Sequence, residues 1–544
     1  MDTLLNRFRE KVNSVIEGFD RIVFKGMIRP IMHAPGMESF LVARRVKNKD
    51  FKSYATAQSK AIVESAEAIA IEQCGRGITY ISSSNVRKEE LAHKRQEETH
   101  VKEGLIGVWS CVESCNTFKS TFDPNSTYPS LRFERSKCKH LYYYFDDPVY
   151  GFMNVRLQTW APYEIQVALN GREWLRRSLD AAGCGYMIDG NKFLHIDDYD
   201  LAQSFLDEQA RTDFRKVLEG FLPSVFPAMP EVVGKGLSYY WTFWQSETAK
   251  DYIFNDRDAL DALMYDFQLY ALITGTGDRI LKYFGSPVRK DGQPHGKTNP
   301  EIISRAKCWY DGLRVRHWNS KNSVKFYNEH NVLRFEVTIN DPTGFKIHRY
   351  SEVQDKSEPK QFLPMRKGIA DTVARAEISK NIINRFTEHM ATVKERTLLG
   401  ELLDSVGSPL ASSGKRSRAL DVFGKDMALL RAISDPAFDV NAITNKQLQN
   451  ALNDTPWAKN TTGRQLSARI TRHLRLLREH GLIKKVQKQR KYVLTDKGRK
   501  ITAALNAALS ACKPLIFIMI IVAVSMSSSG SSMSAATLYF TVPI

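Results

Sequence analysis

This chain of 544 residues has few cysteines, and its sequence predicts no secretion signal. The seven cysteines are an odd number scattered along the chain, which offers no framework of paired disulfides. The first residues, MDTLLNRFREKVNSVIEGFD, contain acidic side chains and no apolar core, so a signal peptide is not expected. A reducing, cytoplasmic compartment is therefore predicted.

Long apolar runs are also scarce. The strongest one, Pro514 to Met526 (PLIFIMIIVAVSM), precedes a Ser-rich end. It is shorter than the roughly 18 to 20 residues that cross a bilayer. Residues 510–544 are therefore predicted to be an apolar and Ser-rich tail, and no membrane partner is expected. A membrane-anchored tail is the alternative.

Several catalytic signatures are missing as well. The chain has no Gly-x-Ser-x-Gly, no His-Glu-x-x-His and no dinucleotide fingerprint. Gly275-Thr276-Gly277 lacks the Lys-Ser/Thr ending of a phosphate-binding loop, so a turn is predicted there. No motif therefore points to a serine hydrolase, a helix-borne zinc protease or a nucleotide-binding enzyme.

Positive charge, in contrast, is concentrated in one segment. Residues 462–500 contain thirteen Lys or Arg and two acidic residues, which is a net charge of +11 against +18 for the whole chain. Such a concentration is expected of a surface that contacts phosphates. DNA is the partner that this charge indicates.

The periodicity of the same segment predicts a helix from about Gln465 to His480. Its apolar face consists of Leu466, Ile470, His473, Leu474 and Leu477. Its exposed face consists of Arg464, Ala468, Thr471, Arg472, Arg475 and Arg478. Gly481 ends the helix, and two short strands follow at 482–486 and 491–494, before a further helix at 497–509.

The segment contains Ser467-x-x-Ile470-x-x-His473-Leu474, followed by Tyr492-x-Leu494-Thr495-x-x-Gly498. This pattern resembles the recognition helix and wing of the MarR and ArsR winged-helix regulators. The resemblance implies that the helix enters the major groove and the wing follows the backbone. The residues that it places against base edges are Arg464, Gln465, Ser467, Ala468 and Thr471. Those that it places against phosphates are Arg472, Arg475, Lys485, Lys488, Arg490 and Lys491.

Some winged helices bind proteins or RNA instead, and that alternative stays open. Members of these families commonly act as dimers, so a homodimer fits the resemblance, although the chain shows no dimerisation heptad. The rest of the chain resembles uncharacterised bacterial proteins, a resemblance that implies no activity.

The chain is long enough for several domains, and its content of 43% hydrophobic and 10% aromatic residues is sufficient for packed cores. The fold class predicted is α+β multidomain, with a mixed α/β body that contains β-meander and hairpin segments, and a C-terminal winged helix-turn-helix. The predicted regions are 1–105 (α/β), 106–235 (β-meander with helices), 236–404 (helical with a β-hairpin), 405–418 (linker), 419–509 (winged helix) and 510–544 (tail). A helix is predicted near Thr3 to Ile16, and helices are predicted to dominate from Tyr199 to Leu281. No internal repeat is evident in the sequence.

A hairpin within residues 324–339 is the best candidate for chemistry. Alternation predicts one apolar face and one face that carries Lys325, Tyr327, Arg334 and Glu336. A phenol, cations and a carboxylate together suit phosphodiester cleavage, in which the phenol attacks phosphorus. The alternative is an ordinary exposed hairpin face with a cross-strand Lys–Glu pair.

The same segment resembles, over about 20 residues, the rolling-circle replication initiators of plasmids and filamentous phages. The match consists of Phe326-Tyr327-Asn328-Glu329 and Leu333-Arg334-Phe335-Glu336-Val337. Glu329 stands where those proteins usually carry Lys, and no metal-binding His-x-His is found. The resemblance implies catalytic roles for Tyr327, Glu336 and Lys325, with Mg²⁺ or Mn²⁺ as cofactor.

Other clusters of ligand-type residues have a structural interpretation that we favour. Cys111, Cys115, Cys138 and His140 could supply four zinc ligands, but core cysteines are expected because the spacing is not that of a knuckle. Asp146-Asp147 and His195-x-Asp197-Asp198 could bind Mg²⁺, but Asp pairs at strand ends are typical of turns. No metal site is therefore predicted apart from a nicking centre.

Two functions follow from the sequence. The first is a regulator-like DNA-binding protein of transcription, which uses the winged helix and has a large N-terminal body of unassigned role. The alternative is a mobile-element or replication-initiator-like enzyme that nicks DNA with a tyrosine nucleophile. Whether the chain is an enzyme stays open at this stage.

Overall fold

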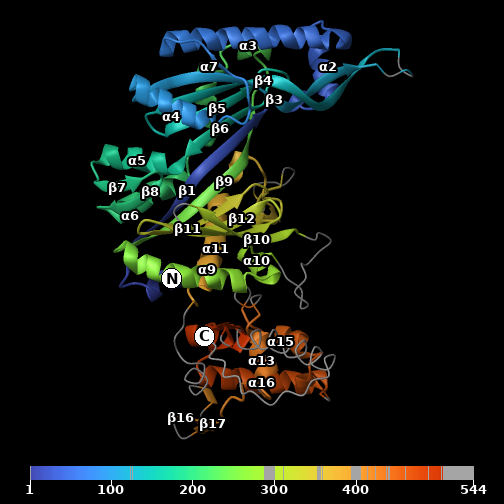
Figure 1. Ribbon diagram of the computed structural model, residues 1–544. Coiled ribbons are helices and arrows are strands. Elements are labelled where there is room, and N and C mark those ends of the chain that lie inside the picture. The colour runs from blue at the N-terminus through green and yellow to red at the C-terminus, as the bar shows by residue number, and fades with distance from the viewer. Residues whose placement is uncertain are drawn as a thin grey trace, which may run out of the picture. The chain divides into compact units, whose positions relative to one another are not determined.

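The computed structural model describes residues 2–506, apart from 123, 125–126, 287–299, 310–311, 352–356, 358, 394–405, 408, 413–414, 423, 436–437, 439–441, 460, 488 and 504 (Figure 1). The chain divides into two compact units. Unit 1 comprises Met1–Gly275 and Pro300–Thr387, and unit 2 comprises Thr276–Asn299 and Glu388–Ile544. The mixed α/β body predicted from the sequence is confirmed.

A mixed sheet of eleven strands forms the centre of unit 1, in the order β10-β11-β12-β13-β9-β1-β6-β5-β4-β3-β2. Neighbouring strands are antiparallel, except β2 and β3, which are parallel. The strands are β1 (Val12–Met27), β2 (Thr79–Ile81), β3 (Gly104–Thr121), β4 (Ser130–Asp147), β5 (Gly151–Gln158), β6 (Ile165–Asn170), β9 (Tyr240–Phe254), β10 (Ile302–Trp309), β11 (Gly312–Asn319), β12 (Asn322–Glu329) and β13 (Val332–Ile339). The sheet thus takes strands from all three regions expected before residue 405.

Helices cover the sheet because most of them bury one apolar stripe against it. They are α1 (Thr3–Arg7), α2 (Ala34–Ala43), α3 (Phe51–Cys74), α4 (Lys88–Thr99), α5 (Gly171–Ala182), α6 (Tyr199–Gln209), α7 (Phe214–Val225), α8 (Met229–Val232), α9 (Arg257–Thr274) and α11 (Thr372–Met390), with short 3-10 turns at Arg29–Ile31, Asn48–Asp50 and Ile369–Asp371. Two small hairpins, β7 (Tyr186–Asp189) with β8 (Lys192–Ile196) and β14 (Lys346–Arg349) with β15 (Gln361–Pro364), complete the unit. In Figure 1, α5, α6 and the β7–β8 hairpin lie together beside β1.

The order of elements in unit 1 repeats. In the first half, β1 leads through helices to the strands β3, β4, β5 and β6, and β6 pairs with β1. In the second half, β9 leads through α9 to β10, β11, β12 and β13, and β13 pairs with β9. The two long strands β1 and β9 pair with each other, and each has a bulge, at Asp20 in β1 and at Trp244 in β9.

The register extends this repeat to single residues. Arg156 pairs with Gln166 in the first half, as Lys325 pairs with Glu336 in the second. The flanking sequences correspond, with Val155-Arg156-Leu157-Gln158 against Val324-Lys325-Phe326-Tyr327, and Gln166-Val167-Ala168-Leu169-Asn170 against Glu336-Val337-Thr338-Ile339-Asn340. The prediction that the chain has no internal repeat was wrong. The two halves of the sheet share their strand pairing, but few of their side chains are alike, so the repeat is hard to detect in the sequence.

Two other sequence predictions for unit 1 need correction. A helix was expected from Thr3 to Ile16, but α1 ends at Arg7 and the long strand β1 follows. Helices were expected to dominate from Tyr199 to Leu281, but β9 lies within that range. β9 is buried over most of its length, and a strand buried on both faces does not show clean period-two alternation.

Unit 2 consists of short strands and mostly short helices, and it has its own apolar core. They are α10 (Gly277–Tyr283), β16 (Leu410–Ser412), β17 (Lys415–Ser417), α13 (Met427–Ile433), α15 (Asn445–Leu452), a 3-10 turn at Pro456–Ala458, α16 (Gly463–Glu479), β18 (Ile483–Lys485) and β19 (Tyr492–Leu494). Leu429, Leu448 and Ile470 are fully buried members of that core. α16 and the β18–β19 pair correspond to the helix and two strands predicted there, and residues 496–503 are helical.

The region 405–418, expected as a linker, contains the short β16–β17 hairpin among its described residues. Residues 510–544, the predicted tail, lie outside the described part of the chain. Within the part that is described, the search for a helix with the length and apolar character to cross a membrane finds none.

We expect Gly171→Ala to destabilise unit 1 by about 1–3 kcal/mol, because it overpacks the junction of α5 and β1. A Cβ atom at Gly171 would lie 2.1 Å from the carbonyl oxygen of Phe19, which belongs to the backbone of β1. Chemical denaturation of the purified variant measures this loss. Gly220→Ala in α7 is the control, since a Cβ there meets nothing within 4 Å; it should be neutral or stabilising by up to about 1 kcal/mol. Equal behaviour of the two variants would contradict the expectation.

Candidate functional site

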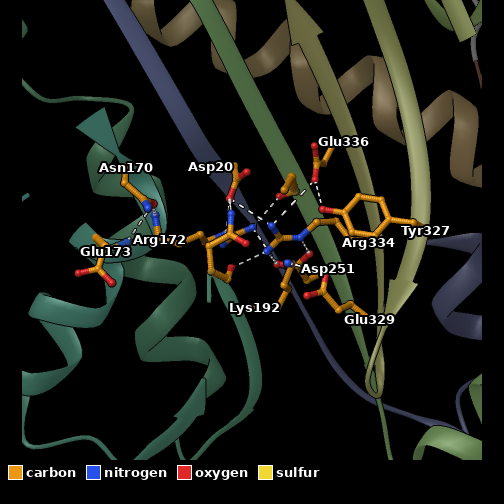
Figure 2. Close-up of polar contacts among 12 residues, drawn as sticks. Asp20, Asn170, Arg172, Glu173, Lys192, Asp251, Tyr327, Glu329, Arg334 and Glu336 are labelled. Atoms are coloured by element: carbon orange, nitrogen blue, oxygen red, sulfur yellow. Dashed lines mark hydrogen bonds and ion pairs between the residues drawn. The ribbon is translucent and has the colours of Figure 1, made fainter. Parts of the chain in front are cut away.

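Polar side chains gather on one face of the sheet where β12, β13, β9 and β1 lie side by side (Figure 2). Side chains of directly paired residues point to the same face. The register pairs Lys325 with Glu336, Tyr327 with Arg334, and Arg334 with Asp251. These residues therefore form one continuous polar strip across three strands.

This strip is largely buried, so the alternative of an ordinary exposed hairpin face is wrong. Tyr327 is 4% exposed, Arg334 1% and Glu336 2%, whereas Lys325 is partly exposed. β13 is buried along its whole length, so both of its faces are covered. On the polar face the cover includes the first turn of α5 and the turn between β7 and β8, which contribute Arg172 and Asn191.

The guanidinium of Arg334 lies at the centre of the strip. It donates to both carboxylate oxygens of Asp251, at 2.6 and 2.8 Å, and to Oδ1 of Asp20 at 3.2 Å. Its third contact is the carbonyl oxygen of Asn191, at 2.8 Å. A bidentate pair of this kind fixes orientation as well as charge.

Arg172 is a second buried cation in the strip. Its Nη2 lies 3.0 Å from Asp251 and donates to the carbonyl oxygen of Ala249 at 3.0 Å. Burial lowers the pKa of this guanidinium from its usual value, although Asp251 acts in the opposite direction. The position of Arg172 follows from α5, whose N-terminus is capped by the side chain of Asn170 and packs closely on β1.

The three residues proposed from the sequence as catalytic lie in contact. The phenol of Tyr327 donates to Oε1 of Glu336 at 2.5 Å, and Lys325 Nζ lies 2.5 Å from Oε2 of the same carboxylate. The guanidinium of Arg314, from β11, lies over the Tyr327 ring at 4.3 Å. The structure thus surrounds the phenol with a carboxylate and two cations.

Asp20, Glu247 and Glu336 form a cluster whose carboxylate oxygens lie within 4.8 Å of one another. The cluster draws on three neighbouring strands, β1, β9 and β13. Burial raises the pKa of Asp20, as does the charge of Glu336, while Arg334 opposes the rise. Burial and the charge of Glu336 likewise raise the pKa of Glu247. Grouped carboxylates with this mutual repulsion are the hard oxygen ligands that Mg²⁺ and Mn²⁺ take in proteins.

The pKa values of the two groups in the Tyr327–Glu336 hydrogen bond are shifted in opposite directions. Burial and the charge of Glu336 raise the pKa of the Tyr327 phenol well above its usual value. Burial acts to raise the pKa of Glu336 too, but Lys325 and Arg334 outweigh it and the pKa lies below its usual value. At neutral pH the pair is therefore a protonated phenol hydrogen-bonded to an ionised carboxylate.

Sequence reasoning missed the carboxylates of this site that lie outside the hairpin. Asp20, Glu247 and Asp251 come from β1 and β9, which are distant in sequence from β13. One signal was available: Asp20 lies between Phe19 and the apolar residues Ile22–Phe24 of a strand, where a buried charge without a partner is costly. Which partner it meets depends on strand order, which the sequence did not reveal.

The aspartate pairs considered as Mg²⁺ ligands have structural roles. Asp147 accepts hydrogen bonds from the backbone of Val149 and Tyr150, and Asp198 caps α6. Asp146 contacts Arg177 and Gln96. These contacts agree with the turn interpretation favoured from the sequence.

The second candidate site is the basic surface of α16 and the following strands in unit 2. The exposed members of the predicted DNA-binding set are Arg464, Gln465, Ala468, Thr471, Arg472, Arg475, Lys485, Arg490 and Lys491. Ser467 is partly buried and, with Thr471, bonds to Asn445 of α15, which holds the two helices together. Lys488 lies outside the described residues.

Two residues of this set also have local structural partners. The side chain of Gln465 accepts a hydrogen bond from the backbone N–H of Thr462, so it helps to cap α16. Arg475 pairs with Glu479 at 2.8 Å along the exposed face of the helix. An exposed pair of this kind contributes little to stability and leaves the cation available to a stronger anion.

Three comparisons with known proteins add no relative to this picture: no protein-family model matches the chain, and no match is found among the curated proteins or the solved structures.

Proposed function

We propose that the protein is a DNA-processing enzyme that cleaves one DNA strand with Tyr327 as the nucleophile. The observation that carries the proposal is the phenol of Tyr327 at 2.5 Å from Glu336, which is itself one of three clustered carboxylates. A nucleophile, a proton acceptor and a set of metal ligands are thus within one buried site. The resemblance to rolling-circle initiators concerns the same residues.

In the proposed step, Glu336 accepts the phenol proton while the Tyr327 oxygen attacks phosphorus. A bond forms between the tyrosine oxygen and phosphorus, and the bond between phosphorus and the leaving deoxyribose oxygen breaks. The leaving oxygen takes a proton from solvent, and the product is a covalent protein–DNA phosphotyrosyl ester. Lys325 and Arg314 lie close enough to neutralise negative charge that develops on the phosphate.

Asp20, Glu247 and Glu336 would hold a divalent cation, Mg²⁺ or Mn²⁺. Such a cation neutralises charge on phosphate oxygens and lowers the pKa of a nearby nucleophile when it is bound. These residues suit a divalent cation because all three are carboxylates and lie close together. A cation between them would relieve their mutual repulsion. Glu247 is partly exposed, so the cluster is not sealed from solvent.

The sheet face that holds this cluster also offers groups suited to a nucleic-acid strand. Lys25 and Arg21 lie on the same face of β1, and Arg21 pairs with Glu247. The indole of Trp244 is 53% exposed, and the Lys25 ammonium lies over it at 5.0 Å. Exposed aromatic rings beside cations are typical of surfaces that stack single-stranded bases.

We further propose that unit 2 binds duplex DNA as a winged helix. Support comes from the exposed cations on α16 and the strands that follow it, and from the Asn445 contacts that fix α15 against α16. In this proposal α16 occupies the major groove, and Lys485, Arg490 and Lys491 contact phosphates. A regulator-like protein that binds DNA without cleaving it is the alternative, and a cleavage assay separates the two.

Cleavage should depend on Tyr327. Supercoiled DNA that contains the protein's own gene and its flanking sequence is incubated with the protein and Mn²⁺, and a denaturing gel detects DNA joined to protein. Wild type should give relaxed DNA and an adduct, and Tyr327→Phe neither, because the nucleophile is absent. Tyr252→Phe is the matched control: it is a buried tyrosine of the same sheet that bonds to Asp2 and not to the cluster. No adduct with wild type, or an adduct retained in Tyr327→Phe, would refute the proposal.

Mn²⁺ should stabilise the folded protein through the carboxylate cluster. A ligand at 100 times its dissociation constant raises the free energy of unfolding by about 2.7 kcal/mol. Thermal unfolding should therefore shift upward with Mn²⁺ in wild type and not in Glu247→Gln. Without metal, Glu247→Gln should be as stable as wild type or more so, because the neutral amide removes repulsion from Glu336. An equal Mn²⁺ shift in both proteins would remove Glu247 from the site.

Duplex binding should weaken when Arg472 and Arg475 are replaced together by Ala. If each contacts a phosphate, affinity should fall by about 2 kcal/mol in total, and the slope of log K against log salt should flatten by about 2. Fluorescence anisotropy over a salt series measures both. The control is the double variant of Lys60 and Lys94, which are exposed on α3 and α4 of unit 1. Unchanged affinity and slope would exclude α16 from the contact.

A further inference from the structure

The repeat in unit 1 gives the Tyr327 site a counterpart in the first half of the sheet. Gln158 occupies the position that corresponds to Tyr327, and Gln166 the position that corresponds to Glu336. Trp244, at the β9 bulge, corresponds to Asp20 at the β1 bulge. The counterpart therefore lacks both the nucleophile and the carboxylates, and whatever it binds must be held by other side chains.

A hollow of about 260 Å³ lies at this counterpart position. Its lining includes the corresponding residues Arg156, Gln158, Gln166 and Trp244. Two more residues of the lining, Cys115 and His140, come from β3 and β4. In the second half, Arg314 occupies the position that corresponds to His140.

Cys115, Cys138 and His140 form a second cluster of metal-ligand type. Their ligand atoms lie within 4.8 Å of one another, and all three residues are buried. The two thiols hydrogen-bond to each other, and neither belongs to a disulfide. Cys111, which the sequence placed in the same set, lies opposite His140 in the register but is not part of this group.

The hydrogen bond of the His140 imidazole selects a tautomer that can ligate a metal. Nδ1 of this imidazole lies 3.2 Å from the carbonyl oxygen of Cys138. A carbonyl only accepts hydrogen bonds, so Nδ1 carries the proton and Nε2 keeps a lone pair. Ligating histidines almost always donate their other N–H to such a partner.

We propose that Cys115, Cys138 and His140 bind a Zn²⁺ ion whose fourth coordination position opens into the hollow. Two thiolates and an imidazole are the soft and borderline donors that select zinc over Mg²⁺ or Mn²⁺. Three protein ligands next to an open position are the arrangement of zinc sites that accept water or another ligand. The nearby cation Arg156 is paired with Glu113 at 2.9 Å, which limits its repulsion of the metal.

The spacing of these residues in the sequence predicts core cysteines and no metal, whereas their arrangement in the fold supports a metal site. This zinc site is independent of the proposed cleavage centre. The two metal sites differ in donor chemistry, because one offers carboxylate oxygens and the other offers sulfur and nitrogen. Thiolate coordination therefore has its own spectroscopic signature, which the carboxylate cluster cannot produce.

The test uses the full chain, purified under reducing conditions without a metal-affinity step. Elemental analysis should find about one zinc per chain. After removal by a chelator, addition of Co²⁺ should give the ultraviolet thiolate-to-cobalt band and the intense visible bands of tetrahedral coordination. Glu247→Gln should leave these bands unchanged, because it alters only the carboxylate cluster.

Cys115→Ser and His140→Ala should each lower zinc affinity by at least about tenfold, since loss of even an outer partner typically costs ~10- to 100-fold. The matched control is Cys74→Ser, a partly buried thiol that bonds to the carbonyl of Leu105 and lies outside the cluster. Circular dichroism shows whether each variant is folded. If a variant does not fold, the Co²⁺ titration of wild type still tests the proposal. Absence of zinc together with no thiolate band, or a zinc affinity and a thiolate band in Cys115→Ser that equal those of wild type, would overturn the proposal.

Discussion

The buried ion pair between Arg334 and Asp251 is the interaction on which the Tyr327 site depends. It joins β13 to β9 between residues 83 positions apart, and both side chains are almost fully buried. Leaving one buried charge without its partner costs about 3–5 kcal/mol, so a shifted register between these strands is strongly disfavoured. The register in turn places Glu336 beside Glu247, and hence the phenol of Tyr327 beside the carboxylate cluster.

The charges around this pair are not balanced one to one. Arg334 and Arg172 share the two aspartates, Asp20 and Asp251, while Lys325 meets Glu336. Burial raises the pKa of Glu247, and the negative charges of Glu336 and Asp20 raise it further. Buried networks that serve stability alone tend to satisfy every member. The imbalance therefore favours a site that takes up a cation.

The sequence predicted elements whose pattern is local and missed relations that depend on strand order. Alternation identified the hairpin of Tyr327 and Glu336, and a 3.6-residue period identified α16, because each pattern lies within one short segment. β9 was missed because burial on both faces removes alternation. Asp20 and Glu247 could not be assigned to the site, since their approach to Glu336 follows from three strands brought together across the sheet.

The pairing of β1 with β9 has a consequence for synthesis of the chain on the ribosome. β1 ends at Met27 and can pair with β6 early, but its other edge has no partner until Tyr240–Phe254 has emerged. During that interval a strand of sixteen residues presents free N–H and C=O groups on one side, which is a template for aggregation. We therefore expect nascent chains that stop before β9 to bind chaperones that shield strand edges.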